Sequence, residues 1–209
     1  MRRLPAPPAR ALGGMGWREA EYAVLDFETT GLDYARDVVV SFGVVPVHGG
    51  RAIVAGSAHE LVRPAVEPSP RSQTVHLLRP KDLADSPPIE VARERLRSLL
   101  ERRYVLAWFA EVEVRFLDRI FGGGVRAWRR RTIDVRNLAI AAAGKPASVR
   151  AEPGFSLGAV ARRYGVPVAS PHEAYDDALV TAQLFLVLVS KLPDLAAPTL
   201  RDILRLGRA

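Results

Sequence analysis

Apolar residues are spaced in two different ways along the chain. Up to about residue 62 they form short, Val-rich runs separated by turn residues, a pattern typical of buried strands. Further along, apolar residues recur at intervals of three and four, which is typical of amphipathic helices. The predicted strands cover residues 21–28, 37–47, 51–62, 104–108 and 131–133. The predicted helices cover 88–103, 110–121, 134–143, 156–164, a long segment ending near 193, and 200–206.

Three details of these elements can be checked against a structure. The segment 63–88 is punctuated by prolines, so we expect short helical pieces there at most. Asp134 is expected to cap the helix that follows it, and Ser156 to cap the next one. The inward positions expected for helix 88–103 are Val91, Leu96, Leu99 and Leu100.

The order of the elements predicts an α/β fold. The first three strands follow one another through short connections, with Gly49-Gly50 as a turn, and so form an antiparallel meander. The later strands alternate with helices, which is typical of parallel pairing. The prediction is a mixed five-stranded sheet, a three-strand meander plus parallel strands, with helices on both faces.

Composition divides the chain into three parts. Residues 1–20 are rich in Pro, Arg, Ala and Gly without apolar periodicity, so we expect a flexible basic arm, either touching nucleic acid through Arg2, Arg3 and Arg10 or solvated. Residues 21–192 form the predicted domain. Residues 193–209 form a tail with a short helix.

The net charge of +7 and the sequence pI of ≈ 10.3 suggest a polyanionic partner such as nucleic acid. Most of this charge is Arg, which in an Ala- and Pro-rich chain also reflects a GC-rich genome. The chain has no cysteine, which excludes disulfides, thiolate metal sites and thiol nucleophiles. No signal peptide or membrane-length apolar run is seen, so we expect a cytoplasmic protein without a membrane partner.

Asp26 and Glu28 close the first predicted strand. Residues two apart on a strand share a face, so these carboxylates should lie side by side. Like charges in a buried setting repel, and a divalent cation between them would remove that repulsion. The alternative is a strand end that carries two acids by chance.

Two further acids point inward. Glu113 lies in the apolar arc of helix 110–121, whereas Glu111 lies on the other side and can pair with Arg115. Asp177 shares the apolar face of the long helix with Thr181 and Leu184. A carboxylate in the core needs a partner, so Glu113 either binds a metal or pairs with an arginine.

His172 lies five residues before Asp177, so both face one site only if His172 precedes the helix in a loop. The segment 170–173, Ser-Pro-His-Glu, also fits a capping box that would start the helix earlier. We favour the loop, because a helix can also start near Asp176. A lone histidine is otherwise an ordinary surface or core residue.

The four inward acids, Asp26, Glu28, Glu113 and Asp177, are hard oxygen ligands that suit Mg²⁺ or Mn²⁺. Two such ions can activate a water and stabilise the leaving oxygen in displacement at phosphorus. His172 would take the proton of that water, because an imidazole ordinarily titrates near neutrality.

Several motifs resemble those of the DEDDh, or DnaQ-like, 3′–5′ exonucleases of the ribonuclease H-like superfamily. Residues 26–32, Asp-Phe-Glu-Thr-Thr-Gly-Leu, match the first motif. Residues 172–178, His-Glu-Ala-Tyr-Asp-Asp-Ala, match the third, and 156–160 with 165–167 resemble the segment before it. The resemblance covers about residues 22–190.

The resemblance implies a ribonuclease H-like fold, two divalent cations and release of nucleoside 5′-monophosphates from a 3′ end. It implies that Asp26, Glu28 and Asp177 hold the ions and that His172 is the general base. Expected partners are single-stranded 3′ ends, with DNA favoured over RNA. A DNA polymerase is a further expected partner if the chain is a proofreading or repair subunit like the epsilon subunit of DNA polymerase III. The implied substrate-binding residues are Phe27, Thr29, Thr30, Gly31, Leu32, Trp108 and Phe109.

The second motif departs from the family. Where the family has His-Asn and later Phe-Asp, residues 108–113 read Trp-Phe-Ala-Glu-Val-Glu. Glu113 thus stands in place of Asp and would act on the ions, directly or through water. Trp108 and Phe109 either belong to the core or stack on a base. The departure also allows an alternative function, a nuclease-fold binding or scaffold protein with weak or no catalysis. The run 126–131 is either a nucleic-acid contact or a solvated connection.

Overall fold

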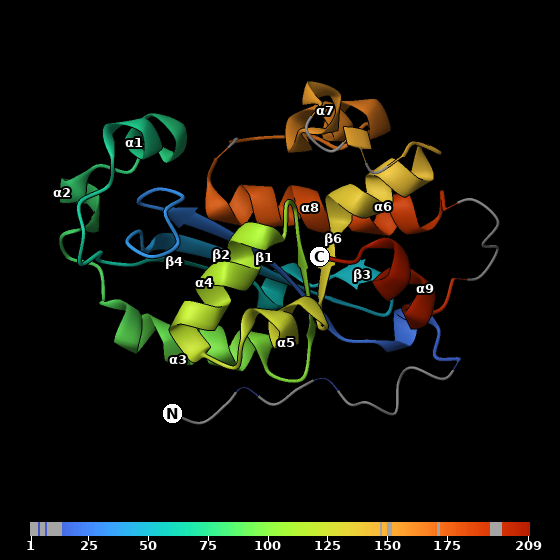
Figure 1. The fold of residues 1–209 in the computed structure, drawn as a ribbon, viewed down its shortest axis with the longest axis horizontal. Helices are drawn as coiled ribbons and strands as arrows, with labels where there is room; N and C mark the ends of the chain where they lie inside the picture. Colours follow the sequence, from blue (N-terminus) through green and yellow to red (C-terminus); the bar gives the residue numbers. More distant parts are fainter. Residues whose placement is uncertain are drawn as a thin grey trace.

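A mixed sheet forms the centre of the computed structural model, which describes residues 4, 7, 14–146, 148–149, 152–170, 172–192 and 198–209 (Figure 1). The strand order is β3-β2-β1-β5-β6, and β4 also pairs with β2, giving six strands. The pairs of β1 with β2 and of β2 with β3 and β4 are antiparallel, whereas β5 is parallel to β1 and to β6. The strands are β1 Tyr22–Thr29, β2 Val39–His48, β3 Arg51–Ala52, β4 Ala58–Leu61, β5 Tyr104–Ala107 and β6 Thr132–Asp134.

Helices cover both faces of this sheet, which confirms the predicted α/β class (Figure 1). One face carries α8, with α6 and α7 against it, and the other carries α3 and α4. The helices are α1 Pro70–His76, α2 Pro80–Leu83, α3 Ile89–Leu100, α4 Glu111–Phe121, α5 Val125–Arg129, α6 Val135–Ala142, α7 Leu157–Tyr164, α8 Ala174–Val189 and α9 Leu200–Leu206. Asp134 caps α6 and Ser156 caps α7, as predicted.

The predicted strand 51–62 is wrong as a single element. It is split into β3 and β4 by a short 3₁₀ helix, η3 Val54–Gly56, although both pieces pair with β2. The break lies opposite Pro46 of β2, whose carbonyl accepts the Ile53 N–H at 2.8 Å. Pro46 has no N–H and cannot donate the second hydrogen bond that would complete its pairing with Ile53. The hydrogen-bond ladder between the two strands is therefore interrupted here.

The prediction that Val91 faces inward is also wrong. Val91 is 62% exposed, and Ala92, Leu96, Leu99 and Leu100 form the buried stripe of α3. At about 100° per residue, these four positions fall on one side of the helix. Val91 precedes Ala92 by one residue, so its side chain points away from that side.

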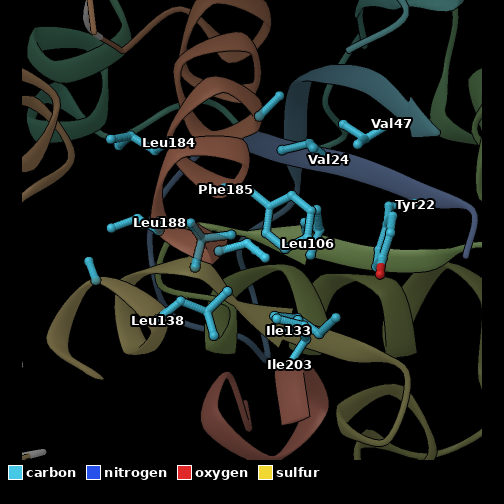
Figure 2. Packing of buried hydrophobic residues seen from close by; sticks show 14 of the residues in the cluster. Tyr22, Val24, Val47, Leu106, Ile133, Leu138, Leu184, Phe185, Leu188 and Ile203 are labelled. Atoms are coloured by element: carbon cyan, nitrogen blue, oxygen red, sulfur yellow. The ribbon is translucent and has the colours of Figure 1, made fainter. Parts of the chain in front are cut away.

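The side chains of β1 alternate between two hydrophobic cores. Tyr22 and Val24 belong to the core under α8, and Leu25 and Phe27 to the core under α3 and α4. Figure 2 shows Phe185 of α8 in the same cluster as Val24 and Tyr22, and the Phe185 and Tyr22 ring centroids are 5.2 Å apart. Because the period of a strand is two, this register places Asp26 and Glu28 on the α8 side of the sheet.

Segments on both sides of residues 21–192 pack against the same core. Trp17 is buried and its ring meets that of Phe185 at 5.7 Å. In α9, Ile203 is fully buried beside Ile133 (Figure 2). The Asp134 N–H donates to the Gly207 carbonyl at 2.7 Å, which joins the end of the chain to β6. Arg2, Arg3 and Arg10 lie outside the described residues. Among the helices that the structure describes, none is long and apolar enough to cross a membrane.

Candidate active site

The first two acids lie where β1 ends, next to the start of α8. Asp26 pairs in register with Gly43 of β2, and Glu28 with Ser41. The backbone of Ala174, the first residue of α8, lies directly over Gly43. A Cβ at Gly43 would be 2.1 Å from the Ala174 carbonyl oxygen, so only glycine allows this approach. The missing side chain therefore lets α8 bring its first turn beside Asp26.

His172 precedes α8 in a loop, which confirms the interpretation that we favoured. The helix begins at Ala174, and His172 has φ +64°, which is outside the helical region. Its N–H donates to Asp177 Oδ2 at 3.1 Å, so the loop folds back over the first turn of the helix. One ligand atom each of Glu28, His172 and Asp177 lies within 4.8 Å of the other two. His172 and Asp177, five residues apart in the sequence, therefore face the same site.

Glu113 is 2% exposed at the start of α4, as its position in the apolar arc predicts. Its Oε2 atom has no hydrogen-bond partner among the described residues. Burial is the main cause that raises its pKa, the carboxylates of Asp134 and Glu28 raise it further, and backbone hydrogen bonds, including one from Phe27, oppose the rise. The side chains whose charges act on Glu113 are thus acids, and the arginine-partner alternative is not supported.

The remaining acids repel one another across the same small space. Burial raises the pKa of Asp26 well above its usual value, and Glu113, Glu28 and Asp177 raise it further. Burial, with Asp177 and Glu173, raises the pKa of Glu28 to about 8. The pKa of Asp177 is raised mainly by burial. Such mutual repulsion is what a divalent cation, with its own larger charge, would reverse.

The turn after β1 is tightly held. The Thr30 hydroxyl donates to Asp37 Oδ1 at 2.8 Å, and the Thr29 hydroxyl donates to the Gly31 carbonyl at 2.8 Å. A Cβ at Gly31 would lie 2.4 Å from Asp37 Oδ2, so the turn needs a glycine. Leu32 follows and is 63% exposed. These contacts hold the predicted substrate-binding turn in one conformation.

A cleft of about 840 Å³ joins the carboxylates to this turn. Phe27, Trp108 and Phe109 line it together with Leu32. Trp108 packs partly against the core, whereas Phe109 is 42% exposed. The cleft also contains arginines, Arg71 of α1 and Arg136 of α6. It therefore combines apolar surfaces, cations and a group of acids, the features expected where a nucleic-acid strand meets metal ions.

Sequence reasoning missed a set of polar residues around the site. Asp134 was recognised only as a helix cap, yet its carboxylate also accepts the Ala110 N–H at 3.3 Å, just before α4. The Glu173 carboxylate lies 3.1 Å from His59 Nδ1, and His59 Nε2 lies 2.9 Å from the Ser41 hydroxyl. The position of Glu173 beside His172 was the only available signal, because His59 and Ser41 come from separate strands.

His76 of α1 was missed as well. It is 6% exposed, lines the cleft, and its Nδ1 accepts the Leu78 N–H at 3.0 Å. Nδ1 therefore carries no proton, and the neutral ring bears it on Nε2. Burial lowers the pKa of His76, which favours this neutral form.

The basic run 126–131 has no single role. Arg129 pairs with Glu111 at 2.6 Å on the surface of α4 and α5. Arg131 is 8% exposed, and its guanidinium donates to the carbonyls of Leu100 and Arg103 at 2.8 and 2.6 Å. Burial lowers the pKa of Arg131 to about 10. Arg131, just before β6, thus binds the end of α3 and the residue that precedes β5, and it is buried rather than a surface contact.

The sequence profile of the RNase T exonuclease family matches residues 23–185, which include all the inward acids and His172. The chain belongs to this exonuclease family. The predicted resemblance to DnaQ-like exonucleases is thereby confirmed at the level of the family.

Two curated relatives are much longer than the chain. It is 31% identical over 190 residues to the PolC-type DNA polymerase III of Thermotoga maritima, covering 90% of the chain and 13% of that protein. It is 23% identical over 189 residues to the 3′–5′ exonuclease DinG of Staphylococcus aureus, covering 90% of the chain and 20% of that protein. The chain therefore corresponds to one part of each relative.

Solved structures share the fold. Zinc-bound E. coli ExoI in complex with single-stranded DNA superposes with a TM-score of 0.71 at 18% identity, over 85% of this chain and 42% of that chain. Exonuclease X in complex with 5′-overhanging duplex DNA gives a TM-score of 0.61 at 23% identity, over 88% of this chain and 99% of that chain. At these identities the likeness confirms the ribonuclease H-like exonuclease fold alone.

Proposed function

We propose that this chain is a metal-dependent 3′–5′ exonuclease that removes nucleoside 5′-monophosphates from the 3′ end of a nucleic-acid strand. The observation that carries the proposal is the convergence of Asp26, Glu28, Glu113 and Asp177 beside His172 in one cleft. At neutral pH, an acid cluster with raised pKa values destabilises the fold unless ions bind there, so the cluster needs a functional reason.

The donor set fits two divalent cations, Mg²⁺ or Mn²⁺. All four carboxylates offer hard oxygen atoms, and the Oε2 of Glu113 supplies a buried acceptor that no described residue uses. Asp26, Glu28 and Asp177 would hold the ions, with Glu113 binding directly or through water. When bound, such ions activate water and stabilise charge on a phosphate.

Glu113 takes the place of the aspartate that the family usually has in its second motif. The extra methylene keeps the charge and lets the carboxylate reach further from the backbone of α4. We propose that Glu113 completes the site, and that the nuclease is active in spite of Trp108 and Phe109.

The other residues would bind and orient the strand. His172 is held beside Asp177 by its own backbone, so its imidazole is placed to take a proton from an attacking water. The backbone of Thr29, Thr30 and Gly31 would contact the terminal nucleotide, and Leu32 would pack against its base. Phe27, Trp108 and Phe109 would complete the apolar wall of the cleft.

For the substrate we propose a single-stranded 3′ end, with DNA favoured over RNA. The complex of E. coli ExoI with single-stranded DNA and the likeness to a PolC-type polymerase support this choice. On the likeness to a PolC-type polymerase we also propose a DNA polymerase as a partner. We further propose that residues 21–192 are the exonuclease domain.

The test uses single strands labelled at either end, incubated with Mg²⁺, Mn²⁺ or EDTA. We expect a label in the 3′-terminal nucleotide to appear as a nucleoside 5′-monophosphate with either metal and not in EDTA. The Asp26→Asn variant, which keeps the shape of the side chain, should fold and lose at least 10³-fold in rate, on the order expected when a metal ligand is lost. Absence of monophosphate with both metals would instead favour a binding or scaffold protein.

A further inference from the structure

We propose that Phe109 and Arg136 form a stacking platform for an unpaired nucleobase of the bound strand. This inference rests on the proposed function and names a part of the site that would recognise single-stranded nucleic acid. Phe109 lies two residues after the end of β5, and Arg136 lies in the first turn of α6. Both line the cleft that contains the carboxylates.

The backbone of Phe109 is strained. Its φ is +61°, in the left-handed region that a bulky side chain seldom occupies. Among the described residues other than glycine, Leu77, Arg102 and His172 share this feature, and His172 is the proposed base of the same cleft. A strained backbone conformation persists only where the surrounding structure holds it, and residues in such conformations are common at functional sites.

Asp134 helps to hold this turn. Its buried carboxylate accepts the Ala110 N–H with Oδ2 at 3.3 Å and the Arg136 N–H with Oδ1 at 2.9 Å. One side chain therefore connects the turn that carries Phe109 to the helix start that carries Arg136. The two side chains are held together before any ligand binds.

The side chains are stacked on each other but not buried. The Arg136 guanidinium carbon lies 4.3 Å from the centroid of the Phe109 ring, and the ring is 42% exposed. A core phenylalanine would be buried, as Phe116 and Phe121 are on α4. An exposed aromatic ring beside an arginine is the arrangement that stacks a base and attracts its phosphate.

A base can stack on Phe109 only when it is not paired within a duplex. The platform would thus favour single-stranded ends and would be largely indifferent to base identity, because every base has a π face. Arg136 would lie close to the phosphate of the same nucleotide. This role is separate from that proposed for Leu32, which lines the same cleft but follows β1 rather than β5.

The experiment measures binding of a fluorescent single strand by anisotropy, in Ca²⁺, with electrophoresis to show that the strand stays intact. Four further strands are compared with the intact one. Each has a single abasic site, at the first, second, third or fourth position from the 3′ end. With the wild-type chain we expect one position at which the abasic site weakens binding about tenfold. Phe109→Asn, whose side chain tolerates the left-handed backbone, should weaken binding of the intact strand about tenfold and abolish the abasic effect.

Two further variants separate the parts of the platform. Phe109→Tyr keeps the ring and should bind as the wild type does. Arg136→Gln should bind more weakly and reduce the slope of log K against log salt by about 0.7, the value for one phosphate contact on a single strand. The matched control is Arg18→Gln, since Arg18 stacks on Trp17 at 4.5 Å, outside the cleft, and should leave binding unchanged.

The proposal is overturned if Phe109→Asn binds the intact strand like the wild type, or if the abasic effect persists unchanged in that variant. Failure of the proposed nuclease function looks different, because it would abolish monophosphate release by the wild type in Mn²⁺ whatever the Phe109 variants do to binding. Folding of each variant is checked by its thermal unfolding transition.

Discussion

At the scale of single residues, Glu113 joins the altered second motif to the rest of the site. It is nearly inaccessible to solvent, and one of its oxygens has no partner in the described structure. An unpaired carboxylate in such a place costs free energy, which a bound cation would recover. Substitution of Glu113 therefore tests whether this residue binds metal or only supports the fold.

Glu113→Ala should lower the rate of monophosphate release about 10²-fold or more, because the site loses a negative charge that faces the ions. Glu113→Asp should keep most of the activity. The control is Glu111→Ala in the same helix, which breaks the surface ion pairs of Glu111 with Arg115 and Arg129 and should change the rate little. Initial rates in Mn²⁺ measure all three. A Glu113→Ala variant as fast as the wild type would refute the role given to Glu113.

The sequence predicted the acids of the site better than their neighbours. Glu113 and Asp177 could be found because a helix has a fixed period, so an acid in an apolar arc must point inward. His59, Glu173 and Ser41 meet only after β2, β4 and α8 have packed together, and no local period shows that. Asp134 gave a partial signal, since its role as a cap was visible and its second contact was not.

At the scale of elements, the start of α8 is held by a chain of contacts across the sheet. His59 of β4 lies between the Ser41 hydroxyl of β2 and the Glu173 carboxylate, at 2.9 and 3.1 Å. Glu173 follows His172 directly and is the N-cap residue of α8. These contacts hold the residue next to His172, so we expect His59 to position the loop that carries the proposed base.

His59→Ala should lower kcat about tenfold and leave KM nearly unchanged. The substitution removes one partly exposed hydrogen-bonded pair that holds the loop, and we expect this to raise the activation free energy by about 1.4 kcal/mol. The matched control is His48→Ala, which removes a similar pair, His48 with Glu21 at 2.8 Å, at the far end of β2. Equal effects of the two substitutions on kcat would show that His59 has only a structural role. His59→Gln, which can still donate a hydrogen bond, should recover part of the rate.

The order and type of the elements were predictable, whereas their edges were not. The strand 51–62 is predicted as continuous because it follows the Gly49-Gly50 turn and contains apolar residues, but pairing depends on the partner strand, where Pro46 lacks an N–H. The inward face of α3 was misjudged at Val91 because a single apolar residue can lie next to the stripe and still be exposed. Both differences arise from packing partners that are distant in the sequence.

At the scale of the whole molecule, the folded unit includes α9, although it follows the predicted domain. Ile203→Ala should lower the free energy of unfolding by about 2–5 kcal/mol, because a fully buried side chain is lost from the core under α8. Val91→Ala, at an exposed position, should change it by less than about 0.5 kcal/mol. Urea unfolding measures both. An Ile203→Ala variant as stable as the wild type would show that α9 contributes little to the fold.

The acid cluster should also make stability depend on pH and metal. The carboxyls of Asp26, Glu28, Glu113 and Asp177 have a higher pKa in the folded protein than in the unfolded chain, that of Glu28 being about 8. Such groups stabilise the fold below their unfolded pKa of about 4, and this contribution is lost as the pH rises through the folded pKa. In EDTA, the Tm should therefore fall between pH 5 and pH 8.

Glu28→Gln removes one of these carboxyls and should show a smaller fall in Tm over the same range. Addition of Mn²⁺ should raise the wild-type Tm more at pH 8 than at pH 5, because the ion binds the deprotonated acids. Scanning calorimetry across this range gives both quantities. The same slope in Glu28→Gln as in the wild type would contradict the electrostatic description of the site.

The most direct test of the central claim is a crystal structure of the protein with Mn²⁺ and a nucleoside 5′-monophosphate, measured at a wavelength where manganese scatters anomalously. We predict two anomalous peaks in the cleft, held by Asp26, Glu28 and Asp177, with Glu113 facing them directly or through a water, and a nucleotide phosphate beside them. An anomalous map with no peak among these carboxylates, or with Glu113 turned away from the ions, would contradict the account.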